Sequence, residues 1–284
     1  MHTPATSSRS TGARARSLAA LAALTVGLSV AFVVAPPRLA ATGSAGDLAD
    51  HGHLIAAFRA AVVEYWRSGD QSSPPALQRV VDYWVRFHLI KGGIAALLLI
   101  VLGTLTVLLW RMFLQSNALR AGSRAAPALA GAGVSLLTLS ALAVVMANVQ
   151  GALAPFSSLL PFMMGGPPDA NLAAVLAQAR RQLAGSHRGS GYTPPALDAM
   201  VGDFAWYHAV LAGIAVAVVV ALLGLSAMSW RRLARADRRA RPVWIWFGGL
   251  SAVSSLLVAV LLVANTGVAR DPAPALLGLF NGGF

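Results

Sequence analysis

Two histidines occupy matching positions in a chain that repeats itself, and they are the residues best placed to do chemistry. His88 and His208 are 120 residues apart, and Asn148 and Asn265 match each other at an offset of 117. A neutral imidazole can bind a metal or haem iron, and it can equally donate and accept hydrogen bonds. We therefore expect these four side chains to form one layer. That layer could hold a metal, a haem or a lipid headgroup, or could simply hydrogen-bond the helices together.

Neighbouring aromatic residues complete the set of candidate binding residues, which is His88, His208, Asn148, Asn265, Trp84 and Tyr207. Two histidines alone do not make a metal site, because carboxylates or further histidines are needed. The His51-Gly-His53 pair is a weaker motif, since its spacing does not place both rings on one helix face. We predict no cofactor, and we name His88 and His208 as the ligands if a metal or haem is bound.

The alignment that relates the histidines extends over most of the chain. Residues 74–95 and 194–215 are identical at nine of 22 positions, beginning with the Pro-Pro-Ala-Leu that opens both stretches. Further along, Pro155 matches Pro272 at the offset of 117. We predict an N-terminal segment, 1–42, followed by two tandem repeats, 43–165 and 166–284. Each repeat contains an amphipathic helix, two membrane spans and an apolar tail.

Long apolar runs dominate the chain between these motifs. Of its 284 residues 57% are hydrophobic and 11% are charged, and none is cysteine, which excludes a soluble domain, a disulfide scaffold and thiolate metal sites. A span needs about 20 apolar residues. Five stretches qualify: Leu18–Ala35, Leu89–Trp110, Ala128–Ala147, His208–Trp230 and Val243–Thr266. They are apolar on every side, so we predict helices, and an all-α integral membrane protein in which an anchor joins a four-helix bundle.

The segments that precede the paired spans have the periodicity of amphipathic helices. Apolar residues recur on one helical face in both repeats, at Leu54, Phe58, Val62 and Tyr65 and at Leu172, Leu176, Ala179 and Leu183. Asp47 or Asp50 is expected to cap the first of these helices, and Ser73 and Thr193 to cap the long helices that follow. The apolar tails are Pro155–Met164 and Pro272–Phe280.

The distribution of charge predicts the orientation. Segments 1–17, 111–125 and 231–242 carry net charges of +3, +3 and +5, whereas segments 36–87, 149–205 and 266–284 each have a net charge of zero. By the positive-inside rule, the N-terminus is predicted to be cytoplasmic, and the amphipathic helices and C-terminus extracytoplasmic. The third basic segment is expected to contact anionic lipid headgroups rather than nucleic acid. Its arginines are Arg231, Arg232, Arg235, Arg238, Arg239 and Arg241.

The first span has two interpretations. A basic stretch followed by 18 apolar residues is also typical of a cleaved signal peptide. Pro36-Pro37-Arg38 follows directly, without a strong small-x-small cleavage site, which favours an uncleaved anchor.

Three stretches resemble a known group of proteins. They are VVDYWVRFHLIKGGIAALLLIVLGTLTVLLW, VMANVQGALAPFSSLLPF and DFAWYHAVLAGIA. They are similar to an uncharacterised family of multi-spanning membrane proteins of GC-rich Gram-positive bacteria, whose members are often labelled as carrying a twin-arginine translocation signal. Here Arg14-Ala-Arg16 departs from an adjacent arginine pair. The resemblance covers about residues 45–270, and it implies a bacterial plasma-membrane location and no particular activity.

These patterns favour a non-enzymatic role, since no nucleophile elbow, Walker loop or zincin motif is present. We expect a protein that binds or scaffolds a membrane lipid, or another membrane or extracytoplasmic protein, at the outer face. One alternative is a haem- or metal-dependent membrane oxidoreductase that uses the two histidines. A second is a small transporter or pore.

Overall fold

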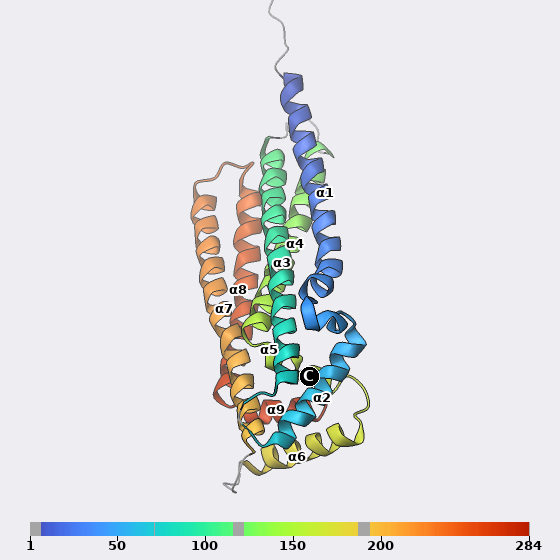
Figure 1. Cartoon of the computed structure of the whole chain (residues 1–284). Coiled ribbons are helices and arrows are strands. Elements are labelled where there is room, and N and C mark those ends of the chain that lie inside the picture. The colour runs from blue at the N-terminus through green and yellow to red at the C-terminus, as the bar shows by residue number, and fades with distance from the viewer. Residues whose placement is uncertain (1–6, 71, 116–121, 187–193, 284) are drawn as a thin grey trace, which may run out of the picture. The chain divides into compact units, whose positions relative to one another are not determined.

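The computed structural model describes residues 7–70, 72–115, 122–186 and 194–283, and every regular element among them is a helix (Figure 1). In chain order these are α1 (Ser7–Ala40), η1 (Gly43–Ala49), α2 (His51–Ser68), α3 (Pro75–Gln115), α4 (Gly122–Leu153), α5 (Pro155–Leu159), η2 (Leu160–Met163), α6 (Ala170–Ser186), α7 (Pro195–Ala234), α8 (Arg241–Arg270) and α9 (Pro272–Phe280). Within the described ranges, α1, α3, α4, α7 and α8 are the five helices long and apolar enough to span a membrane. The prediction of an all-α, multi-pass membrane protein is confirmed.

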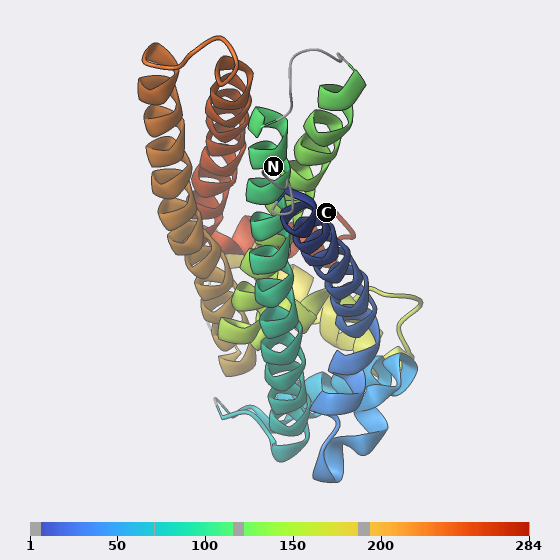
Figure 2. The same cartoon turned by 90° about the horizontal axis from the view of Figure 1, so that it is seen from above.

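The helices α3 and α7 are the longest, at 41 and 40 residues, and neither is interrupted (Figure 2). At a rise of about 1.5 Å per residue each measures roughly 60 Å, twice the thickness of a hydrocarbon core. They begin at the matching prolines Pro75 and Pro195, where the missing N–H has no helical partner to lose. The Ser73 carbonyl accepts a hydrogen bond from Gln78 Nε2 at 2.8 Å. The predicted cap Thr193 lies outside the described residues.

Helix α1 extends past the predicted end of the first span. It continues through Pro36 and Pro37 to Ala40, five residues beyond Ala35. Each proline removes one backbone hydrogen bond to the carbonyl four residues earlier, and both lie within the last five residues of the helix. At the end of the helix the Ala40 carbonyl has no donor within the helix, and it accepts a hydrogen bond from Arg86 Nε at 3.2 Å.

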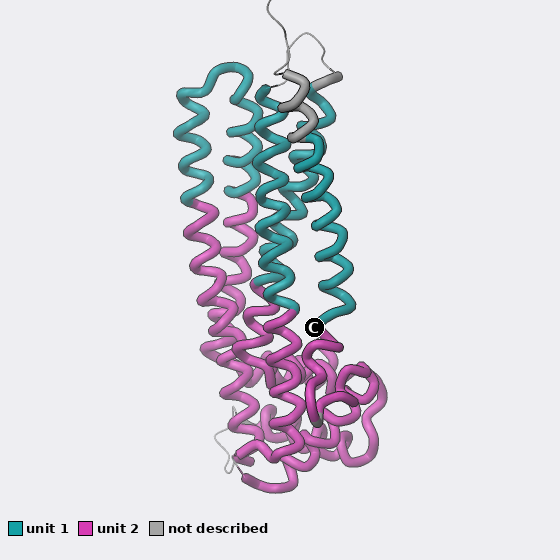
Figure 3. The backbone as a smooth tube through the Cα atoms, turned by 45° about the horizontal axis from the view of Figure 1, so that its top comes forward, with its two compact units in different colours: residues 1–35, 91–145, 224–252 teal, residues 36–90, 146–223, 253–284 magenta. Residues whose placement is uncertain are grey.

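The chain forms two compact units, coloured separately in Figure 3. Unit 1 is Met1–Ala35, Lys91–Val145 and Gly224–Ala252, and unit 2 is Pro36–Ile90, Met146–Leu223 and Val253–Phe284. All five spanning helices contribute residues to both units. Each unit therefore draws on both predicted repeats.

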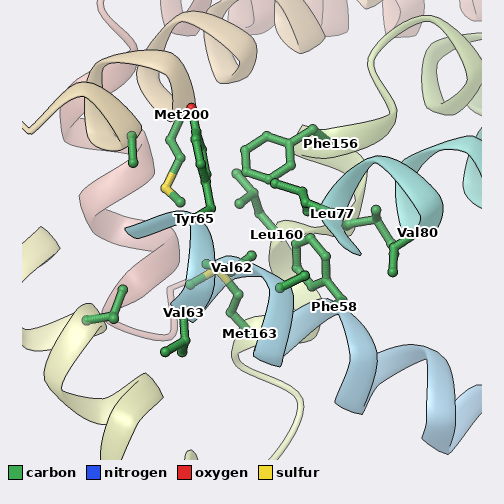
Figure 4. Packing of buried hydrophobic residues seen from close by; sticks show 14 of the residues in the cluster. Phe58, Val62, Val63, Tyr65, Leu77, Val80, Phe156, Leu160, Met163 and Met200 are labelled. Carbon is green, nitrogen blue, oxygen red and sulfur yellow. The ribbon is translucent and has the colours of Figure 1, made fainter. Parts of the chain in front are cut away.

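Unit 2 contains the larger hydrophobic core, part of which is shown in Figure 4. The predicted apolar faces are confirmed, because Phe58 and Val62 of α2, like Leu172 of α6, are fully buried. Helix α2 packs against η2, α6 packs against α9, and α2 and α6 pack against each other. Trp66 Nε1 joins the last pair by donating to Gln178 Oε1 at 3.0 Å. Both apolar tails are therefore folded onto amphipathic helices. Asp50 caps α2, as predicted, by accepting from the His53 N–H at 2.9 Å.

Unit 1 contains two close helix contacts of the same kind. A Cβ atom built on Gly131 of α4 would lie 3.1 Å from the Trp110 ring, and one on Gly248 of α8 would lie 3.0 Å from the Trp230 ring. A Cβ at either position would be in tighter contact than most Cβ atoms make, because an indole lies against the backbone. Trp110 and Trp230 match each other at the repeat offset of 120, as Gly131 and Gly248 do at 117.

Candidate functional site

His88 lies in α3 and is held by Asn148, another of the candidate binding residues. Its Nδ1 is 3.1 Å from Asn148 Oδ1 on α4. The Trp84 ring meets the imidazole edge to face at 4.8 Å, and the Phe87 ring does so at 5.5 Å. Because an amide oxygen only accepts, Nδ1 carries the proton, and the lone pair of the neutral ring is at Nε2.

The imidazole of His88 also lies against bare backbone. A Cβ atom on Gly151 of α4 would be 2.6 to 2.7 Å from three of its ring atoms. Only a glycine permits this approach. At the offset of 117 the matching residue of the second predicted repeat is Val268, so this glycine has no counterpart there.

His208 in α7 makes the corresponding hydrogen bond, with Nδ1 2.7 Å from Asn265 Oδ1 on α8. Asn265 Nδ2 donates to the Leu261 carbonyl at 2.8 Å, which fixes the amide so that its oxygen faces the ring. Phe204 and Tyr207 contact the imidazole at 4.6 and 5.3 Å. Each histidine therefore ties together the two spans of its own predicted repeat.

The other two candidate binding residues have separate contacts. Trp84 stacks on Phe87 at 4.9 Å and donates through Nε1 to Ser158 Oγ at 2.6 Å, so it holds α5 against α3. The Tyr207 carbonyl accepts from Gln150 Nε2 at 3.0 Å, which links α7 to α4. In the described residues, no group of three or more His, Cys, Asp or Glu side chains is arranged to hold a metal ion.

Unit 2 also contains a cavity that sequence reasoning did not find. Its volume is about 380 Å³, and α2, α7 and the junction of α4 with α5 contribute to its wall. The residues that give it chemical character are Tyr65, Leu153, Phe156, Ser157, Asp203 and Trp206. This volume falls in the range of small-molecule sites, about 300 to 1,000 Å³.

The polar groups of this cavity are few and distinct. Asp203 is exposed and is the one charged side chain among its described lining residues. Burial, and secondarily the negative charge of Asp203, raise the pKa of Tyr65, which keeps that phenol neutral. Ser157 is only 3% exposed, and its Oγ has no hydrogen-bond partner in the described part of the chain. Trp206 Nε1 donates to the Leu153 carbonyl at 3.0 Å, which orients an indole that is 55% exposed.

Arg59 and Arg180 hold the two apolar tails, although the sequence marked them only as two of many positive charges. Arg59 Nε of α2 donates to the Phe162 carbonyl at 3.0 Å. Arg180 Nε of α6 donates to the Phe280 carbonyl at 2.8 Å, and its Nη2 donates to the same oxygen. Both bonds therefore join an amphipathic helix to the tail of the same predicted repeat. An alignment of α2 with α6 at an offset of 121 pairs these arginines and would have identified them.

The six arginines from Arg231 to Arg241 lie at the end of α7, in the following turn and at the start of α8, and all are exposed. The Arg232 guanidinium lies over the Trp244 ring at 5.0 Å. Asp237 Oδ1 accepts from the Ala240 N–H at 2.8 Å, so the one acid in the turn is used to start α8. Contact of these arginines with lipid headgroups stays a prediction.

Comparison with protein families, with curated proteins and with solved structures finds no match for this chain.

Proposed function

We propose that this chain is a non-enzymatic protein that binds a lipid at the outer face of a bacterial cytoplasmic membrane. Its N-terminus and the arginine-rich segment 231–242 lie in the cytoplasm in this proposal. Helices α2 and α6, with the apolar tails, lie outside. The positive-inside charge distribution supports the orientation.

The cavity in unit 2 is the observation that carries the proposal. Its lining includes two exposed apolar side chains, Leu153 at the end of α4 and Trp206 in α7, each 55% exposed. Indole rings favour the boundary between hydrocarbon and headgroups. Asp203 and Ser157 give the same cavity polar groups. A cavity lined by both apolar and polar side chains suits an amphiphilic ligand. This favours a lipid over a protein partner.

Lipid retained by the purified chain tests this function. The protein is extracted in mild detergent and its bound lipid is measured by native mass spectrometry. We expect retained lipid in the unaltered chain, and less in Leu153→Ala and Trp206→Ala. Leu256→Ala is the matched control, because Leu256 is 66% exposed on α8 and does not line the cavity. Equal retention in all four proteins would contradict the proposal.

An absorption spectrum of the same samples separates this function from the haem alternative. A Soret band that disappears in His88→Ala and His208→Ala would replace the lipid-binding proposal with an oxidoreductase.

The orientation has its own test, made simple by the absence of cysteine. In intact cells, an impermeant maleimide should label Pro167→Cys, whereas Asp237→Cys should be labelled only after permeabilisation. Both positions are exposed. The reverse pattern would invert the orientation.

A further inference from the structure

We propose that the unit 2 cavity recognises an ammonium group, carried by a lipid headgroup or by a free amine. This inference rests on the proposed function, because it assigns a ligand class to the same cavity. Three features support it: a carboxylate, aromatic walls and a buried hydroxyl.

The charge of the cavity favours a cation. Asp203 contributes a carboxylate, and no basic side chain is present among the described residues that line the space. Its negative charge attracts an ammonium and repels a phosphate at the same position. Recognition of the headgroup therefore starts from its cationic end.

The aromatic walls favour the same ligand. Tyr65, Phe156 and Trp206 all line the cavity. Figure 4 shows Tyr65 and Phe156 in the same part of the core. Aromatic faces attract cations through their quadrupoles, and tryptophan does so most strongly. The bond from Trp206 Nε1 to the Leu153 carbonyl uses the edge of the indole, so this bond leaves the ring face available.

The buried hydroxyl selects among ammonium groups. Ser157 Oγ is buried without a hydrogen-bond partner in the described residues. An unsatisfied buried hydroxyl is unfavourable, and a ligand N–H can remove that penalty. A primary ammonium donates three hydrogen bonds, whereas a quaternary one donates none. The cavity is therefore expected to prefer an ethanolamine headgroup over a choline headgroup.

A lipid titration tests the assignment with the full chain in nanodiscs of phosphatidylglycerol. Phosphatidylethanolamine, phosphatidylcholine or free ethanolamine is added, and binding is measured by native mass spectrometry and tryptophan fluorescence. We expect the ethanolamine lipid to bind at least tenfold more tightly than the choline lipid. Asp203→Asn should lower that affinity at least tenfold, and Ser157→Ala should reduce the preference for ethanolamine. Asp198→Asn is the matched control, because Asp198 is an exposed acid on the same helix outside the cavity lining.

The outcomes separate the two proposals. Lipid binding without headgroup preference, unchanged in Asp203→Asn, would overturn the ammonium assignment and leave lipid binding intact. No lipid binding, with free ethanolamine bound in an Asp203-dependent way, would support the ammonium site and overturn the lipid function. Loss of affinity in Asp198→Asn equal to that in Asp203→Asn would also overturn the assignment, because it would show a general charge effect.

Discussion

Replacing Gly151 by alanine should disrupt the His88 pair, and the structure sets the size of the effect. The new Cβ would lie 2.6 Å from the imidazole, whereas ordinary contact begins at 3.4 Å. The ring must therefore move by about 0.8 Å. A displacement of this size is enough to lengthen the 3.1 Å contact from His88 Nδ1 to Asn148 Oδ1 beyond hydrogen-bonding distance.

The expected change in the free energy of unfolding combines three effects. Overpacking costs about 1–3 kcal/mol. Loss of a hydrogen bond costs about 0.5–1.5 kcal/mol. Alanine in a helix gains about 0.5–1 kcal/mol over glycine. We therefore expect Gly151→Ala to destabilise the protein by about 0.5–4 kcal/mol.

Unfolding in SDS, followed by circular dichroism and by tryptophan fluorescence, measures this change. Gly133→Ala is the control on the same helix, because a Cβ at Gly133 has no neighbour within 4 Å. A double-mutant cycle with His88→Ala isolates the contact, since the three atoms nearest to the new Cβ all belong to the imidazole. We expect Gly151→Ala to be nearly neutral in that background. Equal effects of Gly151→Ala with and without the imidazole would refute the reasoning.

The remaining predictions concern the other contacts of the two units. Gly131→Ala and Gly248→Ala should each destabilise by about 1–3 kcal/mol in the same assay, whereas Gly249→Ala, which has open space for a Cβ, should not. Arg59→Ala and Arg180→Ala should each lower the free energy of unfolding by about 1–2 kcal/mol and make the adjacent apolar tail more susceptible to limited proteolysis. Arg181→Ala, at an exposed position, is the control. Tails cleaved at the same rate in all three variants would show that the arginine hydrogen bonds do not hold them. The pKa of Tyr65 is raised above 10.0, its ordinary value. The contribution of Tyr65 to the stability of the folded state is therefore complete below about pH 10 and is lost as the pH rises through the folded-state pKa. Tyr65→Phe should reduce the alkaline loss of stability, and an unchanged alkaline unfolding profile would contradict that expectation.

The number, starts and buried faces of the helices could largely be predicted from sequence patterns. Apolar runs predicted the five spanning helices because hydrocarbon allows only helices with internally paired backbones. The i, i+4 spacing from Leu54 predicted the buried face of α2. The prolines at 75 and 195 marked helix starts to within a residue. The apolar run from Leu18 to Ala35 marked the span but not the helix end, because α1 continues through Pro36 and Pro37 to Ala40.

Of the candidate site, only the residues at matching positions of the two predicted repeats could be identified from the sequence. Matching positions selected His88 and Asn148 as candidates, and the 3.1 Å hydrogen bond between them is a finding of the structure. The cavity gave no such signal, since its lining comes from separate segments whose proximity is a result of packing. Asp203 therefore entered the sequence analysis only as one acid in a neutral segment. Ser157 was one of many serines, and burial without a partner is a property that only coordinates reveal.

The difference between Gly151 and Val268 bears on the predicted duplication. A duplicated hairpin begins with two identical histidine environments, and each copy is then free to change. One imidazole lies against Gly151, and the position that matches Gly151 in the second predicted repeat carries a branched side chain. A substitution tolerated at one of these two positions is therefore no guide to the other.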